Sequence, residues 1–154
     1  MAKEYKGLFQ MPSSYIYHWW PYLTTSNYEL KSQPTADYNC VSWAQRIDYK
    51  EIDLSLDAEG EPLVYPDLSC LTYIEHFEKE GFILCESPEF EEGFEKIALY
   101  ERAGKTFEHV ARQLGPDLWT SKLGYWEDIE HTTLEVLESQ NKYGVPTWFM
   151  KKAI

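Results

Sequence analysis

The sequence predicts an α+β fold in which helices pack on a four- to five-stranded antiparallel sheet. Apolar residues recur with the period of a helix in the middle of the chain, and they alternate with a period of two in most of the later segments. The alternating segments are joined by short turns that contain glycine, proline and aspartate, which favours hairpins. Helices before a run of strands are typical of an α+β protein.

Helices are expected in three places. The first begins near residue 40, where Asp37 or Asn39 can cap a stripe of apolar residues at 40, 43, 44 and 47. The second starts at about residue 70 and ends at Gly81. The third is expected at residues 128–139, on the apolar positions 129, 134 and 137. Between the first two, the acidic segment 53–69 is expected to be a long surface loop.

The strands of the sheet are expected later in the chain. Four alternating segments, residues 82–85, 94–102, 106–114 and 118–124, form the predicted meander, and residues 145–151 can add a further strand. The aromatic first third of the chain has no clean period, so it is expected to be mostly irregular with short extended pieces.

Length and charge restrict the classes of function. The 154 residues suit one domain, residues 1–154. Acidic residues outnumber basic ones 26 to 14, for a formal net charge of −12. Nucleic acid and membranes are therefore not expected as partners. The absence of a secretion signal or a long apolar segment favours a cytoplasmic protein, although specialised secretion would leave no such mark.

Cysteine spacing argues against disulfides and metal. Cys70 and Cys85 lie in apolar segments and are expected in the core. Glu130 and His131, together with His109, lack the helical spacing of metal ligands. We therefore expect no metal and no cofactor.

Cys40 is the candidate nucleophile. It lies in the first turn of the first expected helix, where unpaired N–H groups favour a thiolate. The alternative is a small core residue, because free cysteine is among the most buried residue types and Cys40 shares an apolar stripe with Trp43. The sequence leaves both interpretations open.

His109 is the candidate base among the four histidines. Strand alternation places it on one face with Phe107, toward either the helices or solvent. Ser121, or Thr120 beside it, can hold the imidazole from the next strand. The alternative is a surface histidine in a lattice of charged neighbours.

Three neighbouring residues are candidate binding residues. Asn39 is expected to cap the helix and could also help to bind an oxyanion. Trp43 shares the helix face of Cys40, and Thr120 lies on the strand that follows His109.

This order of residues resembles the papain-like cysteine hydrolases of the NlpC/P60 and CHAP amidase type. It has a cysteine after an asparagine at a helix start, then "HVA" on a strand, then a polar residue on the following strand. The resemblance implies a papain-like architecture and cleavage or transfer at an amide or related acyl bond of a peptide or other amide-bearing substrate. Cys40 would be the nucleophile, His109 the base, and Ser121 or Thr120 the orienting group.

A longer similarity covers nearly the whole chain. The segments "DYNCVSWA", "GFEKIALYE", "HVARQL", "WTSKLG" and "DIEH" are similar, in this order, to a family of small uncharacterised bacterial proteins with the pattern NC(I/V)(A/S)WA, GFEK(I/V)ALY, H(A/V)ARQL, WTSKLG and DIEH. The similarity implies one compact domain of bacterial or phage origin and no defined activity.

A non-enzymatic protein is the competing hypothesis. The net charge of −12 suits an immunity-like or antitoxin-like protein that binds a basic protein partner. The same motifs would then determine the fold.

Overall fold

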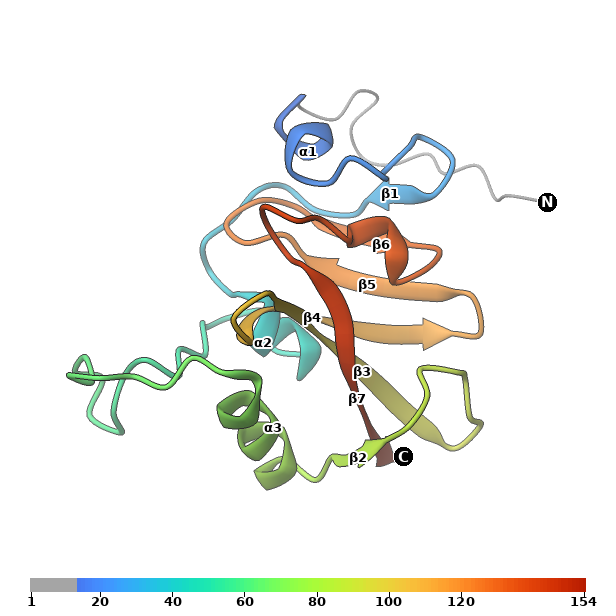
Figure 1. Ribbon diagram of the computed structural model, residues 1–154. Helices are drawn as coiled ribbons and strands as arrows, with labels where there is room; N and C mark the ends of the chain where they lie inside the picture. Colours follow the sequence, from blue (N-terminus) through green and yellow to red (C-terminus); the bar gives the residue numbers. More distant parts are fainter. Residues whose placement is uncertain (1–13) are drawn as a thin grey trace.

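Seven strands form one antiparallel sheet in the order β1-β6-β5-β4-β3-β7-β2 (Figure 1). The structure is a computed structural model and describes residues 14–154, so the expectation about a secretion signal lies mostly outside the described residues. The strands are β1 (Tyr28–Leu30), β2 (Ile83–Cys85), β3 (Phe94–Arg102), β4 (Thr106–Gly115), β5 (Leu118–Lys122), β6 (Asp128–His131) and β7 (Val145–Ala153). The helices are α1 (Ser14–Trp19), α2 (Cys40–Ala44), α3 (Cys70–Lys79) and the short 3₁₀-helix η1 (Glu135–Leu137).

The predicted architecture is wrong. A seven-stranded antiparallel sheet with a few short helices replaces the expected four- to five-stranded sheet with packed helices, and a papain-like fold is not supported. The third expected helix is also wrong, since residues 128–139 contain β6 and η1 instead. Its three apolar positions are buried against one core from a strand and a turn, so their spacing mimics helical periodicity.

Several local predictions are confirmed. Helices begin at residues 40 and 70, and five of the strands fall where alternation placed them. The acidic segment 53–69 forms a loop without a helix or a regular strand, and this teal-to-green loop extends away from the sheet (Figure 1). In the aromatic first third, β1 is a short extended piece, whereas α1 is a helix that the pattern did not indicate. Among the described residues, no helix is long and apolar enough to cross a membrane.

Each face of the sheet buries its own apolar cluster. We call the cluster under α1 and η1 the first cluster; strands β3 and β4 contribute Ala98, Tyr100 and Ala111 to it. We call the cluster under α2 and α3 the second cluster; its strand residues include Leu99 and Val110. Because successive strand residues point to opposite faces, neighbouring residues of one strand belong to different clusters.

A bulge interrupts the pairing of β3 with β4 beside the candidate site. Tyr100 is opposite His109, whereas Glu101 is opposite Phe107, so Glu108 is the extra residue. Phe107 therefore packs against the second cluster while the His109 ring contacts residues of the first. The prediction that these two side chains share a face is wrong, because the bulge breaks the alternation.

A glycine determines how the chain enters β7. Gly144 has φ of +70°, and a Cβ atom at this position would lie 2.1 Å from the carbonyl oxygen of Glu101. Only glycine allows this approach of the two backbones. The contact fixes the position of Tyr143, the residue immediately before it.

Candidate functional site

The start of α2 is fixed by a capping box. The Asn39 side chain accepts a hydrogen bond from the Ser42 N–H at 3.0 Å, and the Ser42 hydroxyl accepts one from the Asn39 N–H at 2.9 Å. The Asn39 amide also donates to the carbonyl of Ile52 at 2.8 Å, which ties the following loop to the helix. The structure therefore places Asn39 as a cap whose polar atoms are already engaged.

The Cys40 thiol lies partly buried at this helix start, beside β4. Burial raises its pKa to about 11, although the backbone N–H groups of Val110, Cys40 itself and Val41 are directed at the sulfur and act in the opposite direction. At neutral pH the thiol is therefore protonated.

Cys40 opens onto a cavity of about 300 Å³. Tyr73 and Phe107 stack on one another in its wall, with ring centroids 3.6 Å apart and an interplanar angle of 9°. Glu51 and Asp53 line it as well, and none of the described residues that line it is basic. The described residues that line it are Asn39, Cys40, Val41, Glu51, Ile52, Asp53, Tyr73, Phe107, Gly124 and Tyr125.

His109 is completely buried, unlike a surface histidine among charged neighbours. Its Nε2 atom lies 2.9 Å from the Ser121 hydroxyl, and its ring stacks on Tyr143 with centroids 4.1 Å apart and an interplanar angle of 5°. Its Nδ1 atom is buried and has no hydrogen-bond partner within residues 14–154. Burial, and then the nearby His131, lower the pKa of His109 well below its usual range, so the ring is neutral.

The hydrogen-bonded chain continues to His131, a residue for which the sequence raised only a metal-binding role and argued against it. The Ser121 hydroxyl lies 2.8 Å from Nε2 of His131, and Nδ1 of His131 lies 2.8 Å from the carbonyl oxygen of Thr133. His131 is completely buried, and burial lowers its pKa to about 4. Among the described residues, no three His, Cys, Asp or Glu side chains are placed to hold a metal ion.

The signal for His131 was present in "DIEH". Strand β6 pairs with β5 so that Ile129 is opposite Ser121, which places His131 two residues further along on the same face. Assigning the segment to a helix removed this alternation, so His131 was not predicted as the neighbour of Ser121.

Cys40 packs against the second cluster and the His109 ring contacts the first, so the thiol and the imidazole lie on opposite faces of β4, with one peptide of that strand between them. The N–H directed at the sulfur belongs to Val110, so it is part of the peptide that joins Val110 to His109. The pairing of β4 with β5 covers Arg112 to Gly115 and does not reach this N–H. Tyr143, whose ring stacks on His109, has its pKa raised by burial and then by the charge of Cys40. Within the described part of the chain, no hydrogen bond joins Cys40 to His109.

Thr120 and Trp43 lie on the other face of the sheet from the imidazole. The Trp43 indole N–H donates to the Thr120 hydroxyl at 2.9 Å, and that hydroxyl donates to the carbonyl of Ile129 at 3.1 Å. These two residues therefore attach α2 to the sheet. Of the two hydroxyls proposed to hold His109, the structure brings only that of Ser121 to the ring.

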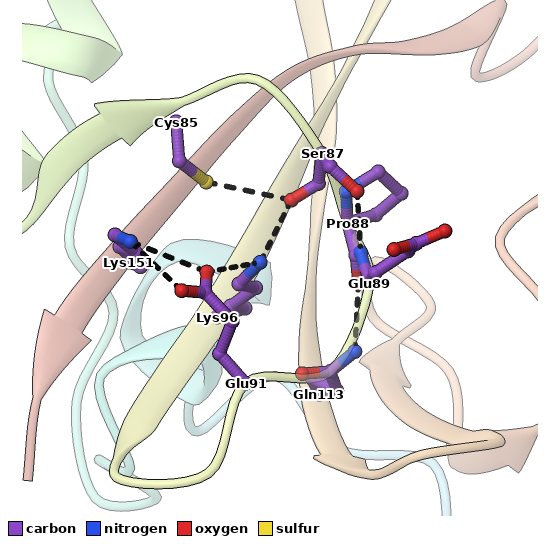
Figure 2. A network of polar contacts seen from close by, with 8 residues as sticks. All are labelled: Cys85, Ser87, Pro88, Glu89, Glu91, Lys96, Gln113 and Lys151. Carbon is purple, nitrogen blue, oxygen red and sulfur yellow. Dashed lines mark hydrogen bonds and ion pairs between the residues drawn. The ribbon is translucent and has the colours of Figure 1, made fainter.

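The other two cysteines are away from this site. Cys70 is buried in the second cluster, which confirms its expected place in the core. Cys85 is only partly buried, and its thiol donates to the carbonyl of Ser87 at 3.5 Å in the separate network drawn in Figure 2.

Comparison with known proteins gives one match. Residues 29–151 match a protein family described as a domain of unknown function (DUF7689). No curated protein and no solved structure matches the chain.

Proposed function

Because the chain belongs to the DUF7689 family, whose description defines no activity, we propose a function from the site itself. Cys40 attacks the carbonyl carbon of an amide or related acyl bond, and His109 accepts the thiol proton. Ser121 holds the imidazole. The proposal concerns this chemistry and does not depend on a papain-like fold.

The position of the sulfur supports this proposal most strongly. It lies against the peptide that joins His109 to Val110, at a stretch of β4 that is not paired with β5. It opens onto a cavity large enough for a small acyl group, and His109 is not among the described residues that line this cavity. Nδ1 of His109 is buried and has no hydrogen-bond partner among the described residues. A buried polar atom without a partner is uncommon and requires an explanation, and an incoming thiol proton supplies one here.

The protonation states determine the order of events. Burial keeps both the thiol and the imidazole neutral, so there is no resting thiolate–imidazolium pair. As the sulfur bonds to the carbonyl carbon, its proton moves to Nδ1 of His109. When the carbon–nitrogen or carbon–oxygen bond breaks, the same proton goes to the leaving group and a thioester remains on Cys40. Water then cleaves the thioester, releasing the acid and restoring the thiol.

The cavity favours a substrate with a positive charge close to the acyl bond. Two acidic residues, Glu51 and Asp53, line the cavity together with the stacked rings of Tyr73 and Phe107. Carboxylates and aromatic faces both attract cations. A basic peptide or another amide with a cationic group is the proposed substrate class.

Acetylation by p-nitrophenyl acetate tests the proposal directly. Cys40 should displace p-nitrophenolate and gain one acetyl group, measured as absorbance and by mass spectrometry of the intact protein and its peptides. His109→Gln should slow this step roughly 100-fold, because it removes the general base. Cys40→Ser should remove the labelled peptide.

Cys85 provides the matched control, since it is also partly buried but lies in another network. Cys85→Ser should leave the rate at Cys40 unchanged. Acetylation of Cys40 no faster than that of Cys85, or a rate unaffected by His109→Gln, would contradict the proposal.

The acidic loop favours a second candidate, a protein that binds a basic partner. Val64 and Tyr65 are 83% and 94% exposed on the loop 53–69, beside acidic residues. A fluorescent amphipathic peptide of lysine and leucine is a suitable probe. Val64→Ser and Tyr65→Ser should weaken its binding, whereas unchanged affinity would exclude this surface.

A further inference from the structure

We propose that His131 is a positioning residue that acts through Ser121 to hold His109 in the tautomer with a bare Nδ1 atom. The tautomers follow from the hydrogen bonds that run from Thr133 to His109, together with the burial that keeps both imidazoles neutral. Their consequence for Cys40 rests on the proposed function.

Thr133 determines the tautomer of His131. The carbonyl oxygen of Thr133 can only accept a hydrogen bond, and it lies 2.8 Å from Nδ1 of His131. That nitrogen therefore carries a proton. Because burial keeps the pKa of His131 near 4, the ring is neutral at pH 7 and its Nε2 atom is bare.

His131 in turn determines the direction of the Ser121 hydroxyl. A bare Nε2 atom can only accept, so the Ser121 hydroxyl donates its proton to His131 across 2.8 Å. A hydroxyl has one proton. Its oxygen must therefore accept from Nε2–H of His109, 2.9 Å away.

Ser121 thereby determines the tautomer of His109. A neutral imidazole with its proton on Nε2 has a lone pair on Nδ1, and this is the atom that is buried without a partner. Two tyrosine rings lie beside the imidazole. The Tyr143 ring is stacked on it, and the Tyr100 ring is tilted against it. The Tyr100 hydroxyl donates its proton to the carbonyl oxygen of Leu134. The hydrogen-bond chain therefore ends in a nitrogen able to accept a proton.

The reverse direction of the chain is unfavourable. If Ser121 donated to His109, then Nδ1–H of His109 would be a buried donor without an acceptor. Nε2 of His131 would also have to donate to Ser121, which would leave His131 charged in a buried site or its contact with Thr133 unbonded. Both consequences favour the first direction.

The histidine tautomers can be measured without any substrate. Long-range proton–nitrogen correlation spectra of the intact protein distinguish a protonated from a bare ring nitrogen. In the wild type, His109 should be protonated at Nε2 and His131 at Nδ1. His131→Phe keeps a flat ring but removes the acceptor, so Ser121 becomes free to donate and His109 should move partly or wholly to the Nδ1–H tautomer.

A second variant and a rescue keep the test informative if His131→Phe folds poorly. Ser121→Ala should remove the link, so that a change at His131 no longer affects the His109 spectrum. His131→Gln can present an amide oxygen to Ser121 and should restore the wild-type tautomer. Both Ser121→Ala and His131→Phe should slow acetylation of Cys40 roughly tenfold, and the double variant no further.

Two outcomes would overturn the inference: Nδ1–H of His109 in the wild type, or a tautomer that neither His131→Phe nor Ser121→Ala changes. The expected tautomers without any acetylation of Cys40 would support the positioning by His131 while contradicting the proposed function. The two failures are therefore distinguishable.

Discussion

Two groups of buried polar side chains share strand β4, and they are built from different chemistry. Near one end of the strand, Gln113 donates to the carbonyl of Pro88 within a network around Lys96, and the Lys96 ammonium contacts Glu91 at 2.8 Å and the Ser87 carbonyl at 2.9 Å (Figure 2). Toward the other end, His109 begins the chain through Ser121 to His131. By strand alternation, Gln113 and His109 lie on the same face of the sheet.

The difference lies in how each network treats charge. Lys96 is 1% exposed but its charge is balanced by Glu91, which also contacts Lys151 at 3.0 Å. The histidine chain carries no charge and ends at a basic nitrogen for which the described part of the protein offers no hydrogen-bond partner. The amide oxygen of Gln113 likewise has no hydrogen-bond partner among the residues that the structure describes, but an amide is not a useful base. The network around Lys96, in which the buried charge is paired, stabilises the fold. The histidine chain leaves a basic nitrogen without a hydrogen bond, and this atom is suited to accept a proton.

Lowering the pH should give the largest difference between the two networks, measured as the change in the free energy of unfolding. Between pH 6.5 and 5, the unfolded chain protonates its histidines while the folded chain keeps His109 and His131 neutral, because burial lowers both pKa values. The unfolded state then binds more protons, so the free energy of unfolding should fall by about 1.4 kcal/mol per pH unit for each imidazole. Urea unfolding at pH 7, 6 and 5 measures this slope.

The control for this prediction is His131→Phe. In this variant the free energy of unfolding should depend less steeply on pH, by the contribution of one imidazole. In the other network, hydrogen bonds from Lys96 and then from Lys151 lower the pKa of Glu91. The ionised Glu91 therefore stabilises the folded state above the ordinary pKa of a carboxylate, and this contribution is lost only as the pH falls below that value. An equal slope in the wild type and His131→Phe between pH 6.5 and 5 would show that the imidazole is not responsible.

Removing Lys96 should have a smaller effect that depends on the replacement. Lys96→Ala deletes a buried stem and should lower the free energy of unfolding by about 2 to 3 kcal/mol. Lys96→Met keeps the stem and should cost less than about 1 kcal/mol, since replacing a buried charge by a packed apolar group is often close to neutral. Thermal and urea unfolding measure both. Neither variant should alter acetylation of Cys40, and a slowed reaction would show that the networks are coupled.

The smallest difference in the free energy of unfolding should come from removing, one at a time, two adjacent hydroxyls that lie on opposite faces of β5. Ser121→Ala leaves two imidazole nitrogens without their partner and should cost about 1 to 2 kcal/mol, while Thr120→Val breaks the bond to Trp43 and should cost about 1 kcal/mol. Only Ser121→Ala should change the His109 tautomer. A tautomer change in Thr120→Val would contradict the separation of the two faces.

The sequence predicted the elements that have a simple period. Alternation located β3, β4 and β5, and the cap at Asn39 located α2. The pairing of His109 with Ser121 followed from these strands and their turn. These features depend on local spacing, which a sequence shows directly.

The remaining features depend on contacts between distant segments. The bulge at Glu108 moved Phe107 to the opposite face from His109, and no local pattern marks it. The apolar residues 129, 134 and 137 fitted a helix because turns placed them against one cluster. Because residues 128–131 were assigned to a helix, strand β6 was not predicted. The sequence therefore predicted neither the number of strands in the sheet nor the position of His131.

Gly144 gives the site a dependence on a residue that has no side chain to contribute. The Tyr143 ring that covers His109 is set by an approach of two backbones that any Cβ atom would prevent. Engineering of the imidazole environment therefore has to keep the backbone at the start of β7 unchanged. A larger residue at this position would displace the aromatic ring over the base, although it would touch neither the cavity nor the cysteine.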